Sequence, residues 1–175
     1  MENDLDLVRR GQLVESMFGW EIVQDTATSQ SPLVLTPSTW IDLPNNGLGS
    51  RTTSEHLIPG RPSIWDTAQD CFINTSLKIG DTVDVRFDVN VTTSSANTEV
   101  SSRLIIGEGD PGEFTIGFGR RLFKSAGTYQ LRNLQMFIVD DDYFREQPAK
   151  VQIYSDTAGV TTVVDKWSIR TLARF

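Results

Sequence analysis

The chain has one histidine and one cysteine, so nucleophilic or acid–base chemistry would depend on very few side chains. A Ser-His-Asp or Cys-His site would have to use His56, and no residue around it belongs to a local hydrolase signature. Cys71 is followed by Phe72 and Ile73, a context typical of a small buried apolar residue. We therefore expect no catalytic residues and predict that the protein is not an enzyme.

Neither metal ions nor phosphates have a well-defined site in the sequence. The run Asp140-Asp141-Asp142 supplies oxygen atoms that suit hard cations, but no EF-hand spacing follows it. A solvated turn is the preferred interpretation, and a metal near this run stays an open alternative. The pair Gly117 and Gly119 does not open a helix after a strand, as a phosphate-binding loop does, and indicates a β-bulge or a close backbone approach instead. The sequence predicts no metal and no cofactor.

Tryptophan side chains are the remaining candidates for ligand contact, because their faces stack on sugars as well as on core neighbours. Trp167 alternates with Val163 and Ile169, which favours a core position. Trp40 and Trp65 stand next to turns, where either role is open. We keep these two residues as candidate glycan contacts of a carbohydrate-binding protein.

Composition and charge exclude several classes of protein. The 175 residues include 16 Lys and Arg against 23 Asp and Glu, a net charge of −7, which disfavours nucleic-acid binding because that affinity comes mostly from cations set against phosphates. One cysteine rules out an internal disulfide. The longest apolar run, residues 136–139, is far shorter than the roughly 20 residues of a membrane span. The acidic start resembles no signal peptide, so we expect a protein without nucleic-acid or membrane partners that is made, kept or assembled inside a cell.

The first twenty residues have a helical pattern. Leu13, Met17 and Trp20 follow helical spacing, with Asn3 as a candidate N-cap and Gly19 near the C-cap. This pattern predicts a helix over residues 4–18, which packs either on its own domain or on a neighbouring subunit.

After this segment the hydrophobic period changes from 3.6 to 2. The clearest case is Thr82 to Val91, where every second residue is Val or Phe. Eight or nine such segments separated by Gly, Asn, Asp and Pro clusters predict an all-β, antiparallel sandwich, and the Ser/Thr-rich crossing at residues 92–98 favours a jelly roll over an immunoglobulin-like fold. We place an N-terminal helix or arm at residues 1–25 and a jelly-roll-like domain at residues 26–175.

The alternation changes parity within residues 129–139. Tyr129 and Leu131 would lie on one face of a strand, whereas Leu134, Met136 and Ile138 fall on the opposite parity. This change predicts a β-bulge near residues 132–133. The end of this strand is apolar on both faces, and we expect the opposing sheet to cover one face and another subunit the other. The candidate subunit-interface residues are Met136, Phe137 and Val139.

Three segments resemble small jelly-roll structural proteins of tailed bacteriophages. They are Trp40-Ile41-Asp42-Leu43-Pro44-Asn45-Asn46-Gly47-Leu48-Gly49, Pro62-Ser63-Ile64-Trp65-Asp66 and Leu77-Lys78-Ile79-Gly80-Asp81-Thr82-Val83-Asp84-Val85-Arg86. The likeness lies in the order of an aromatic strand, an Asn-Gly turn and a Gly-Asp entry into an alternating strand, and covers residues 31–175. The resemblance implies a virion component, usually a homotrimer without catalytic residues, that clamps the capsid shell or forms a fibre tip.

From this resemblance we expect a capsid decoration or cement protein on the capsid surface of a virion, assembled in the host cytoplasm. The expected partners are further copies of the chain in a homotrimer and the major capsid protein. Candidate docking residues form an apolar set on the N-terminal segment, namely Leu5, Val8, Leu13, Met17, Phe18 and Trp20. The alternative is a fibre-tip, receptor-binding or carbohydrate-binding module that uses Trp40 and Trp65, and a polysaccharide depolymerase or cupin-like enzyme is the remote option.

Overall fold

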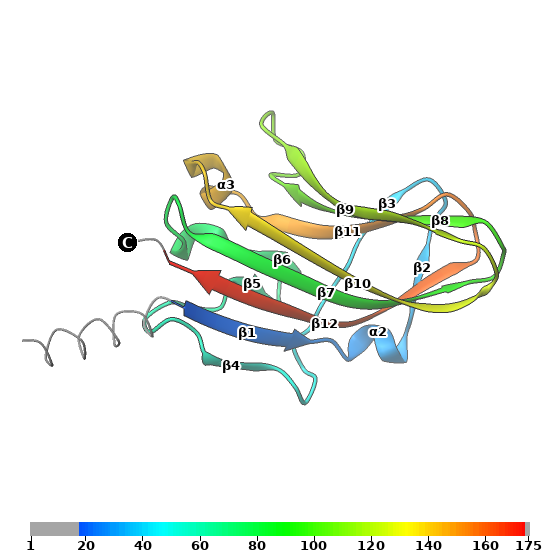
Figure 1. Cartoon of the computed structure of the whole chain (residues 1–175), viewed down its shortest axis with the longest axis horizontal. Helices are drawn as coiled ribbons and strands as arrows, with labels where there is room; N and C mark the ends of the chain where they lie inside the picture. The colour runs from blue at the N-terminus through cyan, green and yellow to red at the C-terminus, as the bar shows by residue number, and fades with distance from the viewer. Residues whose placement is uncertain (1–17, 174–175) are drawn as a thin grey trace, which may run out of the picture.

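A computed structural model describes residues 18–173, which form two six-stranded antiparallel sheets packed face to face (Figure 1). Sheet A contains, in spatial order, β10 (Gly127–Ile138), β7 (Thr82–Thr93), β12 (Val160–Leu172), β1 (Phe18–Gln24) and β4 (Thr53–His56), with β2 (Leu33–Leu35) also paired to β12. Sheet B contains β5 (Trp65–Asp66), β6 (Cys71–Phe72), β11 (Ala149–Ser155), β8 (Thr98–Ile106) and β9 (Phe114–Phe123), with β3 (Trp40–Asp42) also paired to β11. The short helices are α2 (Ala27–Gln30), η1 (Asn74–Ser76) and α3 (Asp142–Glu146). No helix within residues 18–173 is long and apolar enough to cross a membrane.

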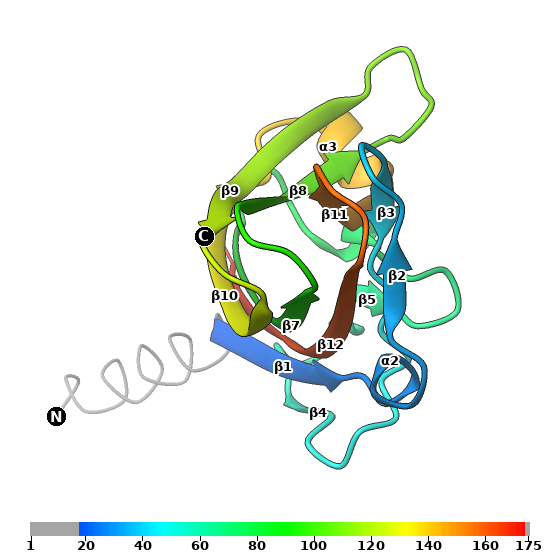
Figure 2. The ribbon, with the colours of Figure 1, turned by 90° about the vertical axis from the view of Figure 1, so that its right-hand side faces the viewer.

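The connectivity is that of a jelly roll. From β7 to β12 the chain crosses to the other sheet at every connection except the β8–β9 hairpin. These crossings place the strands β10-β7-β12-β1 of sheet A opposite the strands β3-β11-β8-β9 of sheet B (Figure 2). Eight strands in two antiparallel sheets with such crossings define this architecture. The all-β, jelly-roll-like sandwich predicted from the alternating pattern is therefore confirmed.

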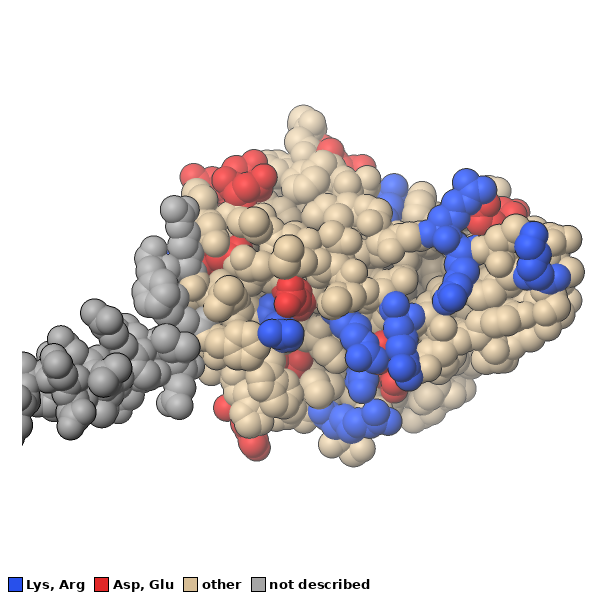
Figure 3. All heavy atoms as spheres, in the orientation of Figure 1, with Lys and Arg blue, Asp and Glu red and all other residues tan. Residues whose placement is uncertain are grey.

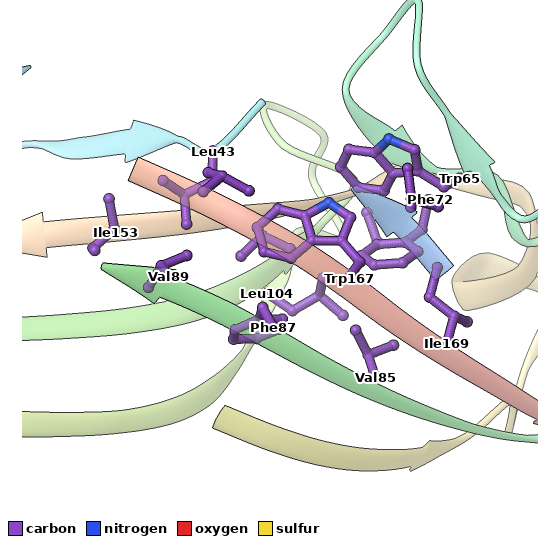
Figure 4. Packing of buried hydrophobic residues seen from close by; sticks show 14 of the residues in the cluster. Leu43, Trp65, Phe72, Val85, Phe87, Val89, Leu104, Ile153, Trp167 and Ile169 are labelled. Atoms are coloured by element: carbon purple, nitrogen blue, oxygen red, sulfur yellow. The ribbon is translucent and has the colours of Figure 1, made fainter. Parts of the chain in front are cut away.

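The core lies between the sheets and is built from alternate residues of the long strands (Figure 4). The predicted alternation of β7 is confirmed, because Val83, Val85, Phe87, Val89 and Val91 are all buried. Trp167 of β12 is also buried, with its ring centroid 5.5 Å from Phe87 and 5.8 Å from Trp65 in edge-on contacts. Burial of one large apolar side chain contributes roughly 1.5–3 kcal/mol, so these residues hold the two sheets together.

Strand β1 begins at Phe18, earlier than the boundary expected at residues 25–26. It pairs with β12 from Phe18 to Gln24. Gly19 permits this arrangement, because a Cβ there would lie 2.5 Å from the backbone nitrogen of Ile58 and only glycine leaves room for such a close approach. The predicted helix therefore does not include Phe18, and its other residues lie outside the described range.

The two predicted bulges have opposite outcomes. In β9 the register shifts opposite Ser102 and Arg103, at Gly117 and Gly119, which confirms the bulge expected there. In β10 the pairing with β7 runs without a shift over all twelve residues, so the bulge predicted near residues 132–133 is wrong. Because the register is continuous, the change of parity turns apolar side chains toward solvent and Asn133 toward the opposite sheet.

Candidate protein-docking face

The outer surface of sheet A carries an apolar strip at the end where β10 and β12 finish and β1 begins. We call this surface the docking face, and its strip consists of Phe18, Leu134, Met136, Ile138 and Leu172. These side chains are between 40% and 68% exposed. Large apolar side chains gathered on one solvent-facing surface are typical of a contact site for another molecule.

The strand register explains why residues far apart in sequence meet in this strip. Directly paired residues of neighbouring antiparallel strands lie side by side on one face. The pairs align two rows across β10, β7, β12 and β1, which read Ile138, Thr82, Leu172, Phe18 and Met136, Asp84, Arg170, Trp20. The face therefore has one apolar edge on β10, a second on β1 and a polar centre.

A shallow groove of about 120 Å³ lies between these two apolar edges. Phe18, Met136 and Leu172 contribute its apolar wall, and Asp84 and Arg170 its polar floor. The guanidinium carbon of Arg170 lies 4.9 Å from the centre of the Phe18 ring, and its Nη1 lies 3.9 Å from Oδ2 of Asp84. An apolar side chain of a partner can enter this groove without burying an unpaired charge.

Basic side chains occupy the middle of the docking face, although the chain as a whole is acidic. Lys and Arg gather over the middle and right-hand part of the view in Figure 3. Arg86 binds Asp88 through two hydrogen bonds of 2.9 and 2.8 Å, and this pairing raises the pKa of the arginine. Arg132 and Lys166 flank Asp88 on the paired strands. The face thus combines an apolar strip with a basic centre, which no single segment of the sequence indicates.

The structure brings together residues that the sequence assigned to two separate surfaces. Phe18 was expected at the end of a terminal helix, Trp20 on the same terminal segment and Met136 at a subunit interface, and all three lie on the outer face of sheet A. Leu5, Val8, Leu13 and Met17 lie outside the described residues. Leu134, Ile138 and Leu172 were missed, although the change of parity in β10 marked the first two.

Phe137 and Val139 do not belong to this surface. Both are buried and form part of the protein's own core, so their assignment to a subunit interface is wrong. The reason is the uninterrupted register of β10, which points odd-numbered residues of this segment into the sandwich.

The two tryptophans proposed as glycan contacts have different surroundings. Trp65 is 4% exposed, and its Nε1 donates a hydrogen bond to the backbone oxygen of Asn45 at 2.9 Å, so its assignment to a sugar-binding surface is wrong. Trp40 is half-buried on the outer face of sheet B. Its ring centre lies 5.3 Å from that of Tyr154 and 4.2 Å from the guanidinium carbon of Arg103. Trp40 therefore remains a candidate aromatic contact.

The reactive side chains considered from the sequence have structural surroundings. His56 is exposed on β4 and stacks on Trp20, with ring centroids 4.2 Å apart. Cys71 is buried, and burial raises the pKa of its thiol. Asp141 caps α3 by accepting a 2.7 Å hydrogen bond from the Phe144 backbone N–H. Within residues 18–173, no three His, Cys, Asp or Glu side chains are grouped to hold a metal ion.

Comparison with known proteins finds no matching family model and no matching curated sequence. Among solved structures, Eiger TNF from S. frugiperda is similar with a TM-score of 0.46 and 11% identity over 90% of this chain and 93% of that one. The CBM22-1 xylan-binding domain of Paenibacillus barcinonensis Xyn10C has a TM-score of 0.41 and 10% identity, covering 59% of this chain and 63% of that one. A chain of the infectious bursal disease virus Gx strain has a TM-score of 0.39 and 8% identity, and the match covers 54% of this chain but 24% of the viral one. Because these three TM-scores are below 0.5, the likenesses do not establish a family or a shared function.

Proposed function

We propose that the chain is a non-enzymatic structural subunit of a virus particle that works by docking onto other proteins through the outer face of sheet A. The observation that carries this proposal is the exposed apolar strip beside a basic centre. A strip of this kind lowers the solubility of the free protein, and contact with a partner removes that cost.

The surroundings of the reactive groups support a role without catalysis. The one histidine stacks on Trp20, the one cysteine is buried, and the carboxylate of Asp141 caps a helix. A general base or nucleophile needs a partner within hydrogen-bond reach and space for a substrate. Within residues 18–173, neither His56 nor Cys71 has a hydrogen-bonded side-chain partner.

The specific form of the proposal is a capsid decoration protein of a tailed bacteriophage that acts as a homotrimer and bridges major capsid protein subunits. Its support is the sequence resemblance described above together with the jelly-roll architecture. A partner that binds only the assembled shell stabilises that shell by RT ln(1 + [L]/Kd), which is about 2.7 kcal/mol per site at 100 times Kd. The apolar strip supplies contact area for the coat protein, for other copies of the chain, or for both.

A charge placed in the strip tests this proposal. Met136→Asp removes apolar contact and leaves a carboxylate to be desolvated, so we expect it to weaken binding to shells of the major capsid protein from the same genome at least about ten-fold. Val34→Asp is the matched control, because Val34 is 71% exposed on β2 and pairs with the opposite end of β12. Co-sedimentation with purified shells measures binding. Equal binding by both variants and the unaltered protein would refute the assignment of the docking face.

The homotrimer has a separate test. Size-exclusion chromatography with light scattering is expected to report three times the chain mass of 19.6 kDa. If Met136→Asp shifts the protein to monomer but Val34→Asp does not, the strip forms the contact between copies. A trimer that survives Met136→Asp would assign the strip to the coat protein, and a monomer at all concentrations would refute the trimer.

A second candidate function is glycan binding by a fibre tip, and the surface cluster of Trp40, Tyr154 and Arg103 favours it. Two partly exposed rings with a guanidinium beside them offer stacking and hydrogen bonding to a sugar. A tryptophan-fluorescence titration with host polysaccharide tests it, with Trp40→Ala as the variant that must lose the signal. A saturable signal that survives in Trp40→Ala would refute this site.

A further inference from the structure

A cavity of about 170 Å³ opens between the edge strands of the two sheets, where β9 and β10 run along the same side of the sandwich (Figure 2). It is separate from the docking face, because it lies between the sheets and not on the outer side of one. Ser102, Gly119 and Arg121 line it from sheet B, and Leu131 and Asn133 line it from sheet A.

The register directs an arginine toward the inside of the sandwich. Arg121 pairs with Val100, and Gly119 pairs with Ser102. Val100 and Ser102 are both buried against the opposite sheet, and paired residues share a face. The side chain of Arg121 therefore starts from the inner face of β9, where a sandwich normally places apolar residues, and reaches the mouth of the cavity at the sheet edge.

The charge of Arg121 is not compensated by any other side chain of the described residues. Its neighbour Arg120 points to the other face and forms an ion pair with Glu99. Arg121 itself has neither a salt bridge nor a hydrogen bond within residues 18–173. An exposed arginine at the mouth of a cavity, without an acidic partner among the described residues, is a ready donor for an anion.

Hydrogen-bonding groups stand opposite this guanidinium. The Nδ2 of Asn133 donates to Oγ of Ser102 at 2.8 Å, which links the two sheets across the cavity. The Ser102 hydroxyl accepts this bond, and its own hydrogen has no acceptor among the described residues. Leu131 is buried beside them and supplies an apolar wall.

Glycine keeps the cavity open. Gly119 has a φ of +140°, and a Cβ added there would meet no atom within 4 Å. No clash requires glycine here, but the positive φ does, because L side chains rarely adopt it, and the space beside this backbone stays open. A pocket with one arginine free of an acidic partner within residues 18–173, one hydroxyl donor and an apolar wall has room for a small organic acid and not for a polymer chain.

We propose that this cavity is a binding site for a small carboxylate ligand, with Arg121 binding the carboxylate and Ser102 and Asn133 binding a hydroxyl or carbonyl beside it. This site goes beyond the docking function and does not depend on it. Sugar acids and simple organic acids share the required chemistry. Two arginines, Arg120 and Arg121, line the cavity, and only Arg120 has an acidic partner within residues 18–173, which favours an anion over a neutral ligand.

The test is a titration of the full chain in which amide chemical shifts report binding. The anionic probes are glucuronate, glutamate, acetate and inorganic phosphate, and glucose is the neutral match for glucuronate. We expect a carboxylate to cause saturable chemical-shift changes at Ser102, Gly119 and Asn133, and glucose to cause none. A probe concentration of up to about 20 mM is enough to detect a Kd of about 1 mM. Tighter binding of glucuronate than of acetate would identify a sugar acid. Equal binding of all carboxylates would identify recognition of the carboxylate group.

Two variants separate the site from general charge attraction. Arg121→Gln is expected to weaken carboxylate binding about ten-fold, because one charge-assisted bidentate contact is lost. Lys124→Gln removes an equal charge from the residue that follows β9 and is expected to change the affinity less than two-fold. The proposal is refuted if no carboxylate gives saturable shifts, if both variants weaken binding alike, or if phosphate binds as tightly as every carboxylate.

Discussion

Gly19→Ala tests the position of β1, the strand that carries Phe18 and Trp20 onto the docking face. A Cβ on Gly19 would lie 2.5 Å from the Ile58 nitrogen and 2.9 Å from its Cγ1, whereas ordinary contacts begin near 3.4 Å. The segment that holds Ile58 must therefore move by nearly 1 Å, although Ile58 is buried and His56 pairs with Trp20. Overpacking of this kind is expected to lower the free energy of unfolding by about 1–3 kcal/mol.

Gly117→Ala is the matched control, because Gly117 also lies in a strand and a Cβ there would meet no atom within 4 Å. Gly117→Ala is expected to leave the free energy of unfolding unchanged or to raise it by up to about 0.5 kcal/mol, because alanine lowers the entropy of the unfolded chain. Urea denaturation measures both variants, and a loss of 2 kcal/mol moves the midpoint by about 1 M. If Gly19→Ala is no more destabilising than Gly117→Ala, β1 does not pack beneath residues 57–58 and the reasoning for the docking face fails.

Two further substitutions test buried groups. Burial raises the pKa of Glu21, against the opposing effect of hydrogen bonds from Ser63 and the Ile64 N–H. The folded state then holds a proton that the unfolded state releases, so the free energy of unfolding falls as pH rises from the ordinary value near 4.5 to the raised pKa and is constant above it. Glu21→Gln is expected to remove this slope in urea midpoints between pH 4 and 8, and parallel curves for the two proteins would contradict the assignment. In the same assay, Trp65→Ala is expected to lower the free energy of unfolding by about 3–5 kcal/mol and Trp40→Ala by about 1 kcal/mol or less. Equal losses would contradict the placement of Trp65 in the core and Trp40 on the surface.

The prediction of the fold succeeded where the pattern was local. Alternation along residues 82–91 implies an inward and an outward face whatever the partner strands are, because side chains of any strand alternate. The prediction of the N-terminal helix was wrong at Phe18, its last residue, because the helical spacing of Leu13, Met17 and Trp20 overlaps a period-2 alternation of Phe18, Trp20 and Ile22. Pairing with β12 decided between these two patterns.

The candidate sites were less predictable than the fold, because both depend on which strands are neighbours. The parity change in β10 is visible in the sequence, but a bulge and an exposed apolar strip explain it equally well until the register with β7 is known. The same register turns Asn133 inward, toward Ser102 and Arg121. In the sequence Arg121 appears as one half of an isolated basic doublet.

Residue types and their spacing were enough to establish an antiparallel β-sandwich, a buried Trp167 and a surface with few reactive groups, because these follow from short-range periodicity and composition. Long-range pairing was needed to place Trp65 inside the sandwich, to bring Phe18 beside Leu172, and to leave Arg121 at the mouth of a cavity without an acidic partner among the described residues. The physical reason is that the two faces of a strand are equivalent until its neighbours bury one of them.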